Sequence, residues 1–299
     1  MTLVIGDISD EPTKKIERFL PLAEYLAANL EEFGYTAGDV LIASSIDDMA
    51  RLVNDGRVDV YMDSPYPSLQ VQRQTESELL LRRWKSGNSS YWSVFAARTD
   101  AALEDLESLR GRVVAAEEPF STSGFALPVS ELIASGIPVV IVDGPQEDVP
   151  SDTVGVWFTR DEENSVDALS IGIVPAAMFS NVDFEELPED VKAELHIIGS
   201  TGSVPRQVTS VGRHVNPVIA GRISELLRQL EDSEEGLALL EHVKTARFDL
   251  IPDADSIPPQ IDVDVAVIDL TRSAAVEHGL KIAREQKSCG RHTGTVREQ

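Results

Sequence analysis

Residues 117–125 read Glu-Glu-Pro-Phe-Ser-Thr-Ser-Gly-Phe and stand where a predicted buried strand at 112–116 changes into a predicted helix at 126–134. The first turn of a helix offers unpaired N–H groups and the positive end of the helix dipole. Hydroxyls placed there add donors, and a glycine lets a ligand approach the backbone. The stretch therefore predicts an anion site. On this local pattern alone, however, a simple serine N-cap is the favoured explanation.

The composition is that of a globular protein with a strongly acidic surface. The chain has 299 residues, enough for two ordinary domains or one large one, and 42% of them are apolar. Asp and Glu number 51 against 26 Lys and Arg, which gives a net charge of -25. Such a chain repels nucleic acid and anionic lipid at long range, so we expect neither as a partner.

The sequence predicts no metal, no cofactor, no disulfide and no membrane span. Cys289 is the only cysteine, and the five histidines show no metal-ligand spacing. No run approaches the roughly 18 apolar residues of a membrane-spanning helix. The first residues, Met1 to Asp7, lack the basic and apolar segments of a signal peptide. The chain as written is therefore expected to carry no export signal.

Strands and helices alternate in the first part of the chain. Apolar runs at 3–6, 39–43 and 58–62 predict strands, with helices between them from Pro12 to Gly34 and from Ser45 to Gly56. This spacing is typical of parallel strand–helix–strand units.

Two crossing regions divide the chain. Strands predicted at 79–84 and 91–98 lead into a second strand–helix series, and residues 200–205 lead back to amphipathic helices at 217–230 and 234–244. We therefore expect an α/β fold of two lobes with a ligand cleft between them. The expected bounds are residues 1–95 and 204–260 for one lobe, 96–203 for the other, and 261–299 for a C-terminal tail.

The third predicted strand continues into Asp63-Ser64-Pro65-Tyr66-Pro67. The carboxyl ends of parallel strands are where open α/β sheets bind ligands, so Ser64 and Tyr66 are candidate ligand residues. An ordinary proline-rich turn explains the segment equally well.

Six motifs occur in a characteristic order over about residues 2–256. They are FLPLAEYL at 19–26, DGRVDVY at 55–61 with the Pro-Tyr segment at 64–66, YWSV at 91–94 with RTD at 98–100, LESLRGRVVA at 106–115, STSGF at 121–125, and ARFDLIPDAD at 246–255. In this order they resemble the phosphate, phosphite and phosphonate substrate-binding proteins of ABC transporters.

The resemblance implies a two-lobed Venus-flytrap fold, similar to type II periplasmic binding proteins, with a mixed sheet flanked by helices in each lobe. It also implies a solute-binding protein, not an enzyme, that captures a phosphorus oxyanion or phosphonate between the lobes for uptake through an ABC transporter permease. We expect a monomer in the periplasm or outside the cell.

The resemblance also assigns site residues, with one departure. Asn164 stands near the place of the family's histidine, and Pro175-Ala176 stands where its aspartate would fall, so ligand identity stays open. The candidate ligand-binding residues are Ser121, Thr122, Ser123, Gly124, Tyr66, Ser64, Tyr91 and Asn164.

Two alternatives remain at this point. The same fold could serve as a sensor or cytoplasmic binding domain for a different small anionic or polar ligand. An enzyme is the weaker alternative, because a nucleophilic Ser121 or Ser123 needs a positioned base and no histidine lies near a triad-like motif.

Overall fold

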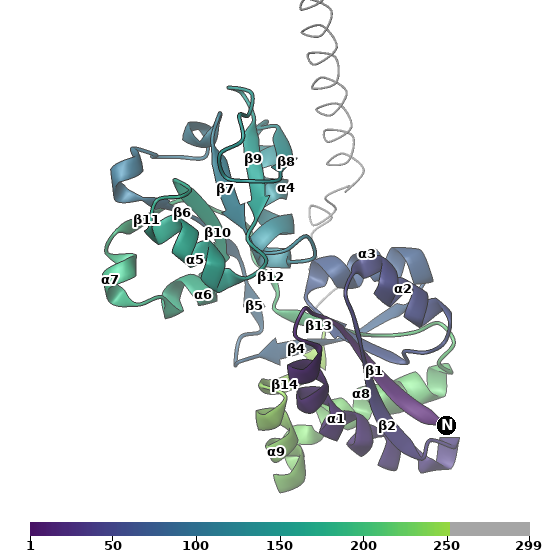
Figure 1. The fold of residues 1–299 in the computed structure, drawn as a ribbon. Coiled ribbons are helices and arrows are strands. Elements are labelled where there is room, and N and C mark those ends of the chain that lie inside the picture. The colour runs from purple at the N-terminus through teal and green to yellow at the C-terminus, as the bar shows by residue number, and fades with distance from the viewer. Residues whose placement is uncertain (252–299) are drawn as a thin grey trace, which may run out of the picture.

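The computed structural model describes residues 1–251, which form two α/β lobes joined by two crossing segments (Figure 1). The predicted tail at 261–299, Cys289 and the end of the ARFDLIPDAD motif lie outside the described residues. None of the helices within residues 1–251 is both long and apolar enough to cross a membrane.

Lobe one is the part of the chain that builds the sheet β14-β4-β13-β3-β1-β2. Its strands β2, β1 and β3 are parallel, and β13, β4 and β14 continue the sheet in antiparallel pairs. The strands are β1 Thr2–Ile8, β2 Ala37–Ala43, β3 Val60–Asp63, β4 Glu78–Lys85, β13 Gln207–Val211 and β14 Thr245–Leu250. The helices are α1 Pro12–Ala28, α2 Ile46–Asn54, α3 Pro65–Thr75, α8 Pro217–Arg228 and α9 Glu234–His242, with 3-10 turns at Glu31–Phe33 and Leu230–Asp232.

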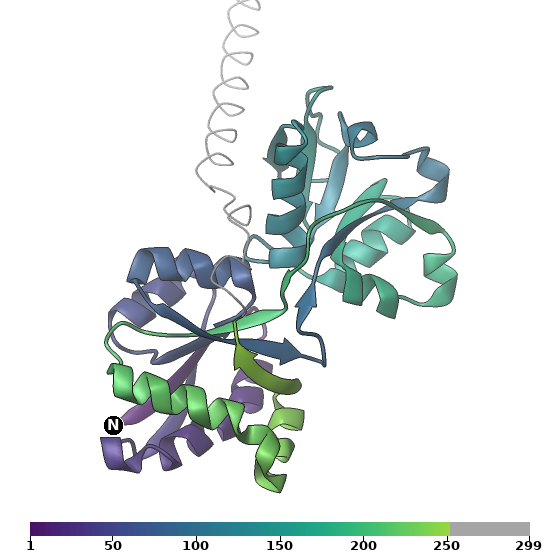
Figure 2. The ribbon, with the colours of Figure 1, turned by 180° about the vertical axis from the view of Figure 1, so that it is seen from behind.

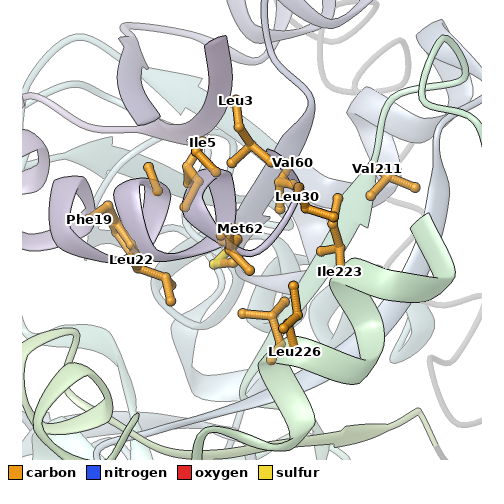
Figure 3. Packing of buried hydrophobic residues seen from close by; sticks show 14 of the residues in the cluster. Leu3, Ile5, Phe19, Leu22, Leu30, Val60, Met62, Val211, Ile223 and Leu226 are labelled. Atoms are coloured by element: carbon orange, nitrogen blue, oxygen red, sulfur yellow. The ribbon is translucent and has the colours of Figure 1, made fainter. Parts of the chain in front are cut away.

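Apolar side chains cover both faces of this sheet. On one face α1, α8 and α9 pack against the central strands, and on the other face α2 and α3 do so. Since the central strands are buried on both sides, they read as continuous apolar runs. Figure 3 shows the first of these clusters, with Leu3, Ile5, Phe19, Leu22, Leu30, Val60, Met62, Val211, Ile223 and Leu226 labelled.

Lobe two is the part that builds the sheet β11-β6-β10-β7-β9-β8. Strands β8, β9, β7 and β10 are parallel, and β6 and β11 complete the sheet in antiparallel pairs. The strands are β6 Ser93–Arg98, β7 Val113–Ala116, β8 Val139–Val142, β9 Val154–Phe158, β10 Ala176–Ser180 and β11 Leu195–Ser200. The helices are α4 Leu127–Ala134, α5 Glu162–Ser170, α6 Asn181–Glu186 and α7 Glu189–Lys192, with 3-10 turns at Thr99–Ala101 and Glu107–Leu109.

The chain crosses between the lobes twice, and the two crossings pair with each other. Strand β5 Ser90–Tyr91 lies between β4 and β6, and β12 Val204–Pro205 lies between β11 and β13. They form a two-stranded antiparallel ribbon in which Tyr91 faces Val204. Figure 2 shows both crossings from behind. The predicted mixed sheets in two lobes are thus confirmed.

Two local predictions were wrong in detail. The turn alternative for Asp63 to Pro67 is wrong: Asp63 ends β3, Ser64 is the N-cap residue and α3 begins at Pro65. Proline is well tolerated in the first turn of a helix, where its missing N–H costs nothing. The strand expected at 91–98 is interrupted at Trp92, where β5 gives way to β6.

We predict that Gly38→Ala destabilises lobe one. A methyl group on Gly38 of β2 would lie 2.2 Å from the carbonyl carbon of Ala23 in α1, where backbone meets backbone and cannot yield cheaply. Overpacking of this kind costs about 1–3 kcal/mol, measured as the free energy of unfolding in urea. Gly144→Ala is the control, because a methyl group there meets no described atom within 4 Å. Equal losses in both variants would contradict the close approach of α1 to β2.

Candidate functional site

The carboxyl ends of strands from both lobes meet between them. The backbone N–H of Tyr66, in the first turn of α3, donates to Thr122 Oγ1 at 2.9 Å. The Tyr66 and Phe125 rings pack edge to face with centroids 6.4 Å apart. Phe120 packs against the lobe-one cluster that contains Ile8 and Ala43. The loop after β7 therefore contacts lobe one directly, at the first turn of α3 and at the cluster on that side of the sheet.

The turn after β7 is built around Ser121. Its hydroxyl accepts from Gly124 N at 2.9 Å and donates to Glu117 Oε2 at 2.7 Å. Residues Thr122–Ala126 form a π-helical turn, for which Ser121 is the N-cap, and α4 continues from it. A Cβ on Gly124 would lie 2.7 Å from Glu117 Cβ, so the glycine makes room for this carboxylate side chain. The N-cap interpretation thus holds for Ser121.

Three further predicted residues gather beside this turn. Thr122, Ser123 and Tyr91 are 1%, 7% and 1% exposed. Thr122 and Ser123 lie close enough to the Tyr91 hydroxyl to act on its pKa, which burial, the larger effect, raises. The structure therefore brings Tyr66, Tyr91, Thr122 and Ser123 together from α3, the crossing strand β5 and the turn after β7.

Asn164 and Ser64 are placed differently. Asn164 is exposed, and its side-chain amide donates to Thr159 O and Asp161 Oδ2, both at 2.9 Å, at the start of α5. Ser64 is the half-buried N-cap residue of α3, and its N–H donates to Asp63 Oδ1 at 2.6 Å. Asn164 is thus engaged in a local helix cap and is not part of the buried tyrosine and hydroxyl group.

Two cations that no sequence motif indicated lie next to the crossing strands in the chain. Arg206 follows β12 and is 9% exposed, with its guanidinium carbon 4.3 Å from the centroid of the Tyr91 ring. Lys85 is the last residue of β4. Neither side chain makes a hydrogen bond or an ion pair with any residue in 1–251.

Carboxylates of lobe two face these cations. Burial, and then the charge of Asp183, raises the pKa of Glu162 to about 7, and burial also raises the pKa of Glu117. Burial, and then the charge of Arg206, lowers the pKa of Lys85 to about 7. Charges of both signs therefore act on one another between the lobes. No group of three or more His, Cys, Asp or Glu side chains that could hold a metal occurs within the described part of the chain.

The model of one protein family matches residues 5–256. Its description is "ABC transporter, phosphonate, periplasmic substrate-binding protein". The chain belongs to this family. It is therefore a solute-binding protein, and the resemblance carried by the six motifs is confirmed.

Solved structures share this fold. XAC2383 from Xanthomonas citri bound to chloride ion matches with a TM-score of 0.82 and 25% identity, over 91% of this chain and 99% of that chain. The same protein bound to ATP matches with a TM-score of 0.81 and 24% identity, over 91% and 98%. PhnD1 from Prochlorococcus marinus in complex with methylphosphonate matches with a TM-score of 0.61 and 14% identity, over 89% and 96%. The fold is that of a type II periplasmic binding protein.

A buried carboxyl group lies at the lobe-one side of this region. Asp63 Oδ2 accepts from the Tyr61 hydroxyl at 2.9 Å, and Asp63 is 8% exposed. Nearby Asp7 is paired with Lys15 at 2.6 Å. Burial, and then the negative charge of Asp7, raises the pKa of Asp63 to about 7.

The raised pKa of Asp63 predicts that Asp63→Asn becomes more stabilising as pH rises. The folded protein holds the Asp63 proton up to about pH 7, whereas an unfolded aspartate loses it near pH 4. Between these values the wild type loses stability as pH rises, and the asparagine does not, so the variant should gain on the order of 1–3 kcal/mol between pH 4 and 8. Urea unfolding at each pH measures this, with the exposed Asp190→Asn as control. A difference that does not change with pH would contradict the raised pKa.

Proposed function

We propose that this protein captures a phosphorus oxyanion or a phosphonate between its lobes and delivers it to the permease of an ABC transporter. The single observation that carries the proposal is the buried group formed by Tyr66, Tyr91, Thr122 and Ser123, to which both lobes contribute. Family membership supports the transport role. A ligand held by residues of both lobes would favour the closed arrangement that a transporter could recognise.

In this proposal the turn after β7 supplies the donors. The N–H groups of Thr122 and Ser123 donate to no backbone carbonyl within residues 1–251, and their hydroxyls lie beside them. The N–H groups and hydroxyls together suit the several acceptor oxygens of a phosphonate. Ser121 and Gly124 fix the shape of the turn, Ser64 begins α3 next to Tyr66, and Asn164 holds the start of α5.

The cellular location and the oligomeric state are part of the same proposal. The family is one of periplasmic substrate-binding proteins, and we place this protein accordingly in the periplasm or outside the cell, acting as a monomer that binds without turnover. The ligands bound in two structures of the same fold, methylphosphonate and ATP, give a reasonable set of probes.

A thermal-shift screen tests the ligand class. Phosphate, phosphite, methylphosphonate and ATP are compared with arginine and glucose, which carry no phosphorus. We expect at least one phosphorus anion to raise the melting temperature, with a stabilisation of about 2.7 kcal/mol at one hundred times its dissociation constant. Recovery of that anion unchanged, checked by phosphorus NMR, is also expected. No shift with any phosphorus anion, or its conversion to product, would count against the proposal.

We predict that Ser123→Ala weakens binding of that anion by at least about tenfold in isothermal titration calorimetry. A hydrogen bond to a charged group contributes about 1.5–3 kcal/mol, which corresponds to this factor. Ser130→Ala is the matched control, because its hydroxyl donates to Ala126 O at 2.8 Å within α4. An unchanged affinity in Ser123→Ala, together with a large loss of stability, would return Ser123 to a purely structural role.

A further inference from the structure

We infer that a direct contact between the lobes holds them together before any ligand binds. The contact, which we call the interlobe latch, consists of Tyr66 from lobe one and of Phe120, Thr122 and Phe125 from lobe two. This role goes beyond the proposed function, because it gives these four residues a closing action that needs no ligand. The unliganded protein is therefore already closed.

The polar part of the latch is a hydrogen bond that caps a helix of the opposite lobe. Helix α3 begins with Pro65-Tyr66-Pro67, so Tyr66 carries the only backbone N–H among its first three residues. An N–H in the first turn has no acceptor inside its own helix. The side chain of the N-cap residue Ser64 makes no capping hydrogen bond, and the Tyr66 N–H donates to Thr122 Oγ1 at 2.9 Å. Lobe two therefore supplies the acceptor for the start of α3.

The apolar part of the latch is an exchange of aromatic side chains between the lobes. Phe120, in the loop after β7 of lobe two, packs against the lobe-one cluster that contains Ile8, Met49 and Val71. In the other direction, Tyr66 of lobe one is 1% exposed and belongs to the apolar cluster that forms the core of lobe two. Each lobe therefore covers an aromatic ring that the other lobe provides.

The Tyr66 ring packs against a series of side chains in lobe two. Its neighbour is Phe125, with ring centroids 6.4 Å apart and ring planes at 73°. Phe125 in turn packs edge to face on Phe158 at the end of β9, with centroids 4.9 Å apart. Ile46 of α2 and Leu69 of α3 pack against the same lobe-two cluster. Lobe one therefore contacts the core of lobe two through several side chains and not through Tyr66 alone.

Burial of these side chains keeps the lobes together. Removal of apolar surface from water stabilises a contact roughly in proportion to its area, and only protein atoms take part in this one. If the lobes separated, the rings of Tyr66 and Phe120 would lose their apolar surroundings. Water could replace the hydrogen bond to Thr122, so apolar burial contributes the larger share. The closed arrangement is therefore favoured in the protein alone.

The latch is compatible with the ligand role proposed for Thr122. A threonine hydroxyl can accept hydrogen bonds and donate its own proton at the same time. The Thr122 hydroxyl that accepts from Tyr66 can thus still donate to an anion oxygen. If the proposed function holds, an anion meets lobes that are already in place, and its binding does not have to drive the closure.

The distance between the lobes in the unliganded protein tests the inference. Spin labels at Asp55→Cys in lobe one and Ser135→Cys in lobe two occupy exposed positions outside the latch, and Cys289→Ser removes the native cysteine. Double electron–electron resonance without ligand should give a single short distance in the otherwise wild-type protein. Phe120→Ala should shift part or all of the molecules to a longer distance, because it removes the ring that lobe one covers.

Phe33→Ala is the matched control for Phe120→Ala. Phe33 is also half-buried, but it packs against the lobe-one cluster on the opposite face of the sheet, so its truncation should leave the distance unchanged. Equal distance distributions in wild type and Phe120→Ala would overturn the inference.

A second pair of variants tests the hydrogen bond and serves if Phe120→Ala fails to fold. Thr122→Val removes the acceptor of the Tyr66 N–H in the closed form, and loss of a buried acceptor costs more than the hydrogen bond itself contributes. It should therefore give the longer distance, whereas Thr122→Ser, which keeps the hydroxyl, should not. Equal distance distributions in these two variants would overturn the latch.

Calorimetric titration of methylphosphonate separates this inference from the proposed function. If only closed molecules bind the anion, the apparent Kd of Phe120→Ala rises as the closed fraction falls, by about tenfold when one tenth of the molecules stays closed. If wild type binds no phosphorus anion, the proposed function fails, and the distance measurement still decides on the latch. If wild type binds methylphosphonate and Phe120→Ala has the same distance distribution and the same Kd, only this inference fails.

Discussion

Strands β5 and β12 pair with each other between the lobes, with Tyr91 opposite Val204 and Ser90 opposite Pro205. The contacts that Tyr91 makes between the lobes depend on this two-stranded ribbon. It sets the Tyr91 ring against Arg206 and directs the Tyr91 hydroxyl to the turn after β7. Because each crossing runs directly into a long strand of lobe one, β4 or β13, a shift of either crossing would also disturb that sheet. The ribbon thus ties the position of the site to the packing of the lobe.

Whether an anion can bind depends on the charges close to the site and not on the net charge of the chain. The whole chain carries a net charge of -25, which opposes any anion at long range. Charges beyond about 8 Å are largely screened at physiological ionic strength, so the nearest groups decide what can bind. Between the lobes these nearest groups include Arg206, which lies against the Tyr91 ring, and the N–H groups at the start of the turn after β7. An acidic surface and an anion-binding interior are therefore compatible.

The turn after β7 also shows how one short motif can hold two roles. Ser121 is occupied by Gly124 N and Glu117, and it stabilises the turn as a cap does. Thr122 and Ser123, the next two residues, are the ones that lie beside Tyr91. Each residue of the motif must therefore be assigned separately, either as a helix cap or as a candidate ligand residue. For Thr122 and Ser123 the anion-binding role stays a prediction.

The sequence by itself determined the family and the architecture. Hydrophobic periodicity, glycines at the ends of helices and the STSGF motif are local properties that can be recognised without knowledge of tertiary contacts. It also indicated Tyr66 and Tyr91, which the family motifs mark. Tertiary structure alone decided which side chains meet. Tyr91 and Arg206 are far apart in the chain, and only the β5–β12 pairing brings the Arg206 guanidinium against the Tyr91 ring. Tertiary structure also decided the contacts of Asn164, which the sequence puts near the place of the family's histidine: its side-chain amide donates to Thr159 and Asp161 at the start of α5. Its role toward a ligand stays a prediction.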